Sequence, residues 1–164
     1  MSTQVIFVFG SNQLGVHGAG AAKEAVQYWG ARPGVGVGLQ GNSYAIPTKD
    51  KKIQTLPLHR IKQYIAGFID CAEAHPDLEF QVTAVGCGLA GYHAPDIAPA
   101  FSQAPKNCIL PPSFRSHVAG DHQFRDHDLV PRIVAKPVTI PDAPIARWPF
   151  SHTKPPRPPS KKSK

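Results

Sequence analysis

The sequence predicts an α/β fold in which a partly parallel sheet is covered by helices on both faces. Short apolar runs, rich in β-branched and aromatic residues, alternate with stretches whose apolar residues recur at helical spacing. Two of the apolar runs end in glycine-rich loops that lead into helical stretches. Alternation of this kind is typical of parallel sheets, which bind ligands beyond the carboxyl ends of their strands. The length of 164 residues suits one domain with its own core.

The first predicted strand is residues 5–9, an apolar run that stops at Gly10. A glycine-rich loop follows and leads into a helix that we expect to run from Gly20 to about Trp29. Glycines let backbone amides approach a ligand closely, and a helix N-terminus carries partial positive charge. This segment therefore predicts either a phosphate-binding loop or a tight turn in which glycine serves geometry alone.

Three more elements are expected in the middle of the chain. Residues 34–41 alternate glycine with other residues, which predicts either a flexible loop or backbone that lies flat against something. Residues 43–47 predict a short strand, and Pro47 marks its end or places it at a sheet edge. The clearest helix covers residues 58–72, where apolar residues recur at spacings of three, four and seven.

The second glycine loop follows the strand predicted for residues 80–85 and covers residues 86–92. A short helix from Pro95 and a last strand at residues 107–110 complete the predicted body. If the strands at 5–9 and 80–85 are neighbours, the two loops face each other across one crevice. Two loops that both offer amides favour a diphosphate over a single phosphate.

The basic charge of the chain is concentrated in its C-terminal third. The net charge is +7, yet residues 1–110 hold eight lysines and arginines against seven acidic residues. Residues 111–164 hold ten against four, together with eleven of the eighteen prolines. This composition predicts a folded body over residues 1–112 and an irregular or disordered, proline-rich basic extension over residues 113–164.

The composition also sets expectations for location and metal binding. No apolar run approaches the roughly 20 residues of a membrane span, and no basic-then-apolar leader opens the chain, so we expect a cytoplasmic protein without a membrane partner. Three cysteines without a CxxC motif argue against disulfides and structural zinc. We expect no metal and no cofactor. His117, His122 and His127 alternate with aspartates, which fits a solvated linker better than a metal site.

Three short motifs resemble those of the macrodomain family, whose members bind ADP-ribose. The motifs are Gly18–Ala22, Ile46–Lys49 and Gly86–Ala90. Their order and spacing are similar to those of the terminal ADP-ribose glycohydrolase branch and of small macro-like proteins from phages and bacteria. The similarity extends from residue 4 to about residue 110. It implies a macrodomain-like three-layer α/β/α fold with a mixed, partly parallel sheet, and a site for ADP-ribose.

The resemblance also implies the residues that bind the ligand. The first loop would hold the distal ribose and one phosphate, with Asn12 on the ribose, and the second loop would wrap the diphosphate. The first-loop residues are Gly10, Ser11, Asn12, Gly18, Ala19, Gly20 and Ala21. The second-loop residues are Gly86, Cys87, Gly88, Leu89, Ala90, Gly91 and Tyr92.

The candidate catalytic residues are His17 and Lys49. His17 lies in the loop expected to touch the ribose, where an imidazole suits general acid or base catalysis. Lys49 matches the lysine of the glycohydrolase branch, whose catalytic aspartate is replaced here by Ala90. The alternatives are a loop histidine that hydrogen-bonds to the backbone and a lysine in a solvated charged run. Cys87 stands at a helix start, where a thiol pKa falls, but it fits better as a small loop residue than as a nucleophile.

Three functional hypotheses follow. The chain binds ADP-ribose or a related ADP-ribosyl derivative and hydrolyses it, as an ADP-ribosyl hydrolase or an ADP-ribose 1″-phosphatase. Alternatively, it is a non-catalytic module that reads or sequesters ADP-ribose; residues 1–11 contain no acidic residue of the kind that macrodomains place on the adenine amino group. The third hypothesis is a nucleic-acid-binding accessory protein, which makes weak contacts to the phosphate backbone through its basic extension.

Overall fold

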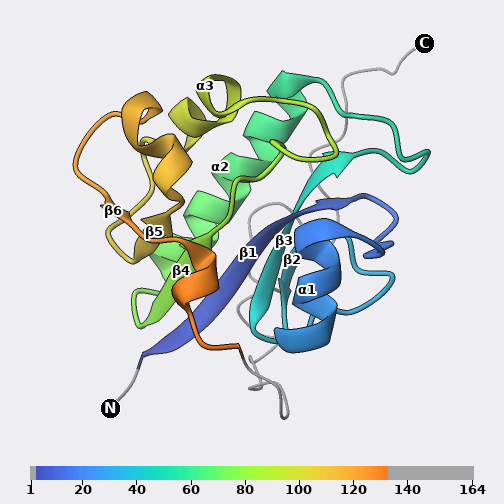
Figure 1. Ribbon diagram of the computed structural model, residues 1–164, viewed down its shortest axis with the longest axis horizontal. Coiled ribbons are helices and arrows are strands. Elements are labelled where there is room, and N and C mark those ends of the chain that lie inside the picture. The colour runs from blue at the N-terminus through green and yellow to red at the C-terminus, as the bar shows by residue number, and fades with distance from the viewer. Residues whose placement is uncertain (1–2, 133–164) are drawn as a thin grey trace.

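A mixed, mostly parallel six-stranded sheet forms the centre of this α/β protein (Figure 1). The computed structural model describes residues 3–132. The strands are β1 (Gln4–Asn12), β2 (Gly38–Gln40), β3 (Ser43–Lys49), β4 (Leu78–Val82), β5 (Cys108–Leu110) and β6 (Gln123–Phe124), in the order β2-β3-β1-β4-β5-β6. The helices are α1 (Gly20–Tyr28), α2 (Leu58–Ala74) and α3 (Ala94–Ile97), and the short 3-10 helices are η1 (Ala98–Phe101), η2 (Pro112–His117) and η3 (His127–Leu129). Only the β2–β3 pair is antiparallel among these strands.

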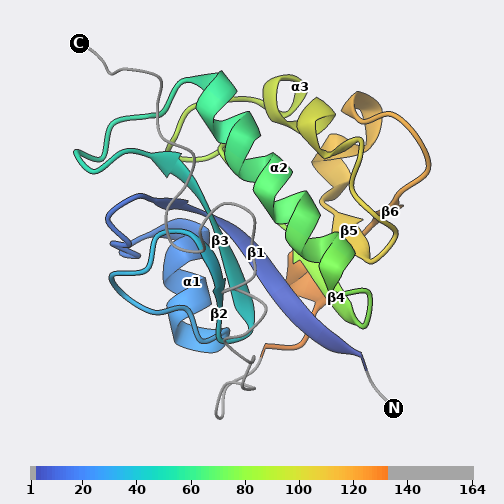
Figure 2. The same ribbon diagram turned by 180° about the vertical axis from the view of Figure 1, so that it is seen from behind.

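The central strand β1 is apolar on both faces because helices cover both sides of the sheet. Ile6 and Val8 belong to the core cluster under α2, whereas Phe7 and Phe9 belong to the cluster under α1. Successive side chains of a strand point to opposite faces, so a continuous apolar run is buried entirely only in this arrangement. The two views show α2 and α1 on opposite faces of the sheet (Figures 1 and 2).

Helix α2 supplies the larger of the two cores. Ile61, Ile65 and Phe68 of its apolar stripe are fully buried. The ring of Phe68 contacts those of Tyr44 on β3 and Phe80 on β4, with centroids 5.1 and 5.4 Å apart. Burying a side chain of this size stabilises a fold by about 1.5–3 kcal/mol. The stripe therefore fixes α2 across the middle of the sheet, and the predicted helix at residues 58–72 is confirmed.

The other predicted elements are confirmed with shifted ends. The first helix ends at Tyr28 and the second glycine loop follows β4, which ends at Val82. Pro47 lies within β3, which has β1 on one side along its length. On its other side β3 pairs with β2 only as far as Ala45, so Pro47 stands at an edge there. Residues 38–40, part of the glycine-alternating stretch, form the short strand β2.

The prediction of an irregular extension from residue 113 is wrong for residues 113–132. Phe114 in η2 is fully buried, with its ring centroid 5.6 Å from that of Phe101. The strand β6 extends the sheet by pairing with β5, and Val130 is buried against the α1 side of the core. These anchors are too widely spaced to create a periodic apolar pattern, so the composition hides them. The remainder of the predicted extension, residues 133–164, lies outside the described residues.

Two expectations from composition concern cysteines and membranes. All three cysteines are free, as expected. Burial raises the pKa of the Cys71 and Cys108 thiols to about 12, so both remain protonated at neutral pH. No helix in the described part of the chain combines the length and apolar character that a membrane span needs.

Candidate functional site

The two glycine loops meet at one edge of the sheet. They follow β1 and β4, which are neighbouring parallel strands, with Val8 opposite Val82. The carboxyl ends of parallel neighbours lie at the same edge. A β-carbon built on Gly10 would lie 3.5 Å from the backbone nitrogen of Gly86, so the two loops begin in direct contact. The two strands are therefore neighbours, which is the condition on which the two loops were expected to share one edge.

Asn12 fixes the shape of the first loop. Its side-chain nitrogen donates to the carbonyl of Val16 at 2.7 Å, and its side-chain oxygen accepts from the amide of Val16 at 3.0 Å. Both ends of the Asn12 amide therefore serve the loop. A carboxamide has two N–H donors and two acceptor positions, so one of each remains for a ligand. The contact with a ribose predicted for Asn12 would have to use these remaining positions.

The glycine-alternating stretch lies flat against the first loop. A β-carbon on Gly36 would lie 2.2 Å from the carbonyl oxygen of Asn12, and one on Gly15 would lie 2.4 Å from the backbone of Gly34. The Ser11 hydroxyl donates to the carbonyl of Gly36, and the amide of Gly34 donates to the carbonyl of Gly15 at 2.8 Å. These glycines therefore allow two backbone segments to touch, which selects the flat-backbone alternative over the flexible loop. Ser11 is buried in this contact.

His17 is packed inside the protein rather than displayed on the loop. Its side chain is 8% exposed, and its ring edge meets the ring of Phe9 with centroids 5.3 Å apart. Nε2 lies 3.1 Å from the carbonyl oxygen of Val35, to which it donates. Burial lowers the pKa of His17, so the ring is neutral at physiological pH. This is the arrangement of a loop histidine that supports the backbone, and it makes His17 a poor proton donor.

Lys49 lies beside the first loop at the end of β3. It is the register partner of Asn12, and its carbonyl accepts from the amide of Gln13 at 2.9 Å. The residue is half-buried, and within residues 3–132 its ammonium forms no ion pair. Of the two predicted catalytic residues, Lys49 is the one whose charged group is available to an anion at this edge.

The second loop is folded by its own backbone and fastened to the loop that follows β3. The amide of Tyr92 donates to the carbonyl of Gly86 at 2.9 Å, and the Tyr92 hydroxyl donates to the carbonyl of Leu56 at 2.8 Å. The Thr55 hydroxyl donates to the carbonyl of Ala90 at 3.0 Å. Tyr92 therefore positions the loop with its hydroxyl, and only the rest of the ring is available to stack on a ligand.

The tips of both loops present bare backbone to the outside. A β-carbon on Gly18, Gly20, Gly88 or Gly91 would meet no atom within 4 Å. Helix α1 begins at the first of these loops, with Ala19 as an N-cap residue that forms no side-chain cap and with no acidic residue in the first turn. The amides of an uncapped first turn and its partial positive charge favour an anion. Ala21, on this first turn, is half-buried.

Cys87 is a half-buried loop residue with a raised thiol pKa. Burial is the main cause, and the negative charge of Asp96 adds to it. The expectation that a helix start lowers this pKa is therefore wrong, because burial disfavours the thiolate, and because α3 begins only at Ala94 with Asp96 at its N-terminus. The carboxylate of Asp96 accepts from the amide of His93 at 3.0 Å, as a first-turn acid does. Leu89, two residues after Cys87, is 74% exposed.

The sequence reasoning missed the third loop at this edge, residues 50–57. Thr55 and Leu56 hold the second loop, and Ile53 is exposed with a φ of 61°. The signal was available, since β3 was predicted as a strand and a parallel partner of β1 must end at the same edge.

The macrodomain resemblance stays a prediction. Neither the models of known protein families, nor the curated proteins, nor the solved structures contain a match to this chain.

Proposed function

We propose that this chain binds ADP-ribose or a related ADP-ribosyl derivative at the edge where β1, β3 and β4 end, in a macrodomain-like manner. The observation that carries the proposal is the pair of open glycine loops on neighbouring parallel strands, beside the uncapped start of α1. Amides from two loops suit a diphosphate, because each phosphate can accept from a separate group of donors. A ligand with two linked phosphates fits this edge better than a free phosphate.

The division of the ligand follows from the neighbours of each loop. The first loop, with Gly18, Gly20 and the start of α1, would take the phosphate next to the distal ribose. The second loop, with Gly88 and Gly91, would take the other phosphate. The exposed side chains of Val16 and Leu89 flank these glycines in the sequence and would contact the apolar faces of the sugar or base.

Hydrolysis of the bound ligand is the second candidate function, and Lys49 is the residue that favours it. Its ammonium lies at the same edge and is free of ion pairs within the described residues. A lysine at this place would pair with a phosphate or stabilise charge at the anomeric centre. His17 is less suited to the chemistry because its ring is buried and donates to Val35. Without turnover, the same site makes a reader of ADP-ribose.

The test of binding uses Gly18→Val and Gly88→Val. Both glycines have ordinary backbone angles and open surroundings, so valine should be tolerated by the fold and obstruct only the ligand. Gly20 is unsuitable because its φ of 60° would strain a valine, and loss of binding would then be ambiguous. Ala74→Val, exposed at the far end of α2, is the matched control.

Calorimetric titration with ADP-ribose should show binding by the wild type and Ala74→Val, and a loss of about tenfold or more in each loop variant, equivalent to about 1.4 kcal/mol. Equal affinities in all four proteins, with equal melting temperatures, would reject the two-loop site. Single-turnover hydrolysis of ADP-ribose 1″-phosphate and of an ADP-ribosylated carboxylate then tests catalysis. Lys49→Ala should lower the rate by about a hundredfold if Lys49 acts on the reaction. Absence of turnover by a wild type that binds ADP-ribose would identify a reader.

A further inference from the structure

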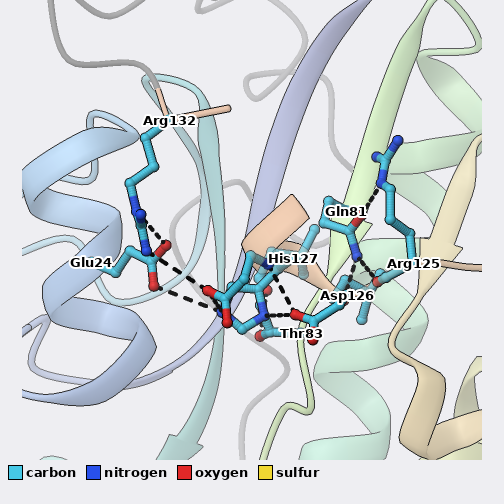
Figure 3. Close-up of polar contacts among 10 residues, drawn as sticks. Glu24, Gln81, Thr83, Arg125, Asp126, His127 and Arg132 are labelled. Atoms are coloured by element: carbon cyan, nitrogen blue, oxygen red, sulfur yellow. Dashed lines mark hydrogen bonds and ion pairs between the residues drawn. The ribbon is translucent and has the colours of Figure 1, made fainter. Parts of the chain in front are cut away.

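Three side chains that can ligate a metal come together on the α1 face of the sheet from two distant parts of the chain. Figure 3 shows two of them, Glu24 and His127, pointing toward each other. Glu24 comes from α1, and His127 and Asp128 come from η3. Nε2 of His127 lies 3.7 Å from Oε1 of Glu24 and 3.4 Å from Oδ1 of Asp128. One ligand atom from each residue lies within 4.8 Å of the other two.

We propose that Glu24, His127 and Asp128 bind a divalent transition-metal ion of the zinc class. Around a tetrahedral ion with bonds of about 2.1 Å, neighbouring ligand atoms lie about 3.4 Å apart. The two distances from Nε2 of His127 are close to this spacing. One imidazole nitrogen with two carboxylate oxygens suits zinc or a similar ion. Calcium needs six to eight oxygen ligands, roughly twice what these residues supply.

The surroundings of His127 favour coordination through Nε2. Nδ1, on the other side of the ring, lies 3.8 Å from a carboxylate oxygen of Asp126. The two atoms are too far apart for a hydrogen bond, but the negative charge beside Nδ1 favours a proton on that nitrogen and leaves Nε2 to bind the ion. The ring also packs edge-on against Phe7, with centroids 5.6 Å apart, which limits its rotation. The imidazole is thus held with its coordinating nitrogen toward Glu24 and Asp128.

The charge of the cluster favours a cation. Three carboxylates, on Glu24, Asp126 and Asp128, surround one imidazole, and the only arginine among the described residues that joins them is Arg132. Nε of Arg132 lies 3.2 Å from Oε2 of Glu24, and Nη2 of Arg132 lies 3.7 Å from Oδ1 of Asp128. Because Oδ1 of Asp128 also faces His127, the ion and Arg132 compete for the same oxygen.

A bound ion would fasten the end of the described chain to the body. Residues 126–132 carry no helix longer than η3, and they contact the α1 side of the core through Val130, through the His127 ring against Phe7 and through Arg132 over the Tyr28 ring. An ion held by both α1 and η3 would cross-link two segments that are more than a hundred residues apart in the sequence. The thiols of Cys71 and Cys108 are buried in the core on the α2 side of the sheet, away from this cluster. Three protein ligands would leave a coordination position for water.

Calorimetric titration of the full chain with zinc chloride tests the proposal. The variants are Glu24→Gln and Asp128→Asn, which keep side-chain size, and Arg132→Ala, which removes the competing cation. His117→Ala, at an exposed histidine of η2, is the matched control for adventitious histidine binding. Melting curves without metal establish that each variant is folded. A titration with magnesium chloride measures how much of the binding is unselective attraction of a divalent cation to the carboxylates.

We expect saturable binding of one zinc ion by the wild type and by His117→Ala, weakened by about tenfold or more in Glu24→Gln and Asp128→Asn. Arg132→Ala should bind more tightly than the wild type. Zinc at about a hundred times its Kd should raise the wild-type Tm by roughly 5 °C or more. The proposal would be overturned if zinc binding were not saturable, or if Glu24→Gln and Asp128→Asn both bound zinc as tightly as the wild type. Weaker zinc binding by Arg132→Ala than by the wild type, or magnesium binding as tight as zinc binding, would also overturn it.

Discussion

Replacement of Phe114 with alanine should strongly destabilise the protein, although Phe114 lies in the segment whose composition predicts an irregular extension. Its side chain is fully buried and its ring contacts Phe101, which in turn contacts Phe68 of α2 with centroids 6.1 Å apart. Truncation of a buried phenylalanine to alanine costs about 3–5 kcal/mol, the sum of lost transfer free energy and a residual cavity. Small proteins are stable by only about 5–15 kcal/mol, so a large share of the stability depends on this ring.

Urea unfolding, followed by circular dichroism, measures the effect. The midpoint for Phe114→Ala should fall with little change in the m-value, because the variant exposes nearly the same surface on unfolding. Ser113→Ala, exposed one residue earlier in η2, is the control and should change stability by less than about 0.5 kcal/mol. A loss of less than about 1 kcal/mol for Phe114→Ala would refute the packing of η2 against η1. It would support the prediction from composition that this segment is an irregular extension.

Three further predictions concern buried groups. Since burial lowers the pKa of His17 below the 6.5 of the unfolded chain, the unfolded state binds more protons as the pH falls, and stability should fall between about pH 7 and pH 5; in His17→Gln this slope should be smaller, and an unchanged slope would contradict the burial. Gly36→Ala should cost about 1–3 kcal/mol, because the new β-carbon would lie 2.2 Å from the carbonyl of Asn12; thermal melting checks this, and a neutral result would mean that the two loops do not touch. Arg125→Met should cost about 1–3 kcal/mol in urea unfolding, because it removes the donor at 2.7 Å from the buried oxygen of Gln81; no loss would show that Gln81 finds another donor.

The sequence predicted the parts of the fold whose side chains repeat. The run at residues 5–9 is apolar throughout because both faces of β1 are buried. The stripe on α2 is visible in the sequence because the buried residues of a helix recur every three or four positions. Strand alternation predicted that the two glycine loops meet if β1 and β4 are neighbours, and the structure shows that they are. These predictions depend on regular spacing, which a single sequence displays directly.

The parts that could not be predicted depend on single residues with distant partners. Phe114 and Val130 are isolated anchors in a proline-rich stretch, and nothing in their neighbours signals burial. Gln81 is a polar residue buried on β4 because Arg125, far along the chain, covers it. The direction of the His17 ring depends on its contact with Val35, in a stretch whose glycines fitted two interpretations. Pairing across such distances becomes visible only in the folded chain.

The most direct test of the proposed site is calorimetric titration of the full wild-type chain with ADP-ribose at about 50 mM and about 200 mM salt, with a DNA duplex titrated alongside. We expect one molecule of ADP-ribose to bind with nearly the same affinity at both salt concentrations, because backbone amides carry no net charge and their binding to phosphates releases few counterions. Absence of binding by ADP-ribose would contradict the proposal. Tight duplex binding that weakens by about a thousandfold over the same range, with no response to ADP-ribose, would assign the chain to nucleic acid instead.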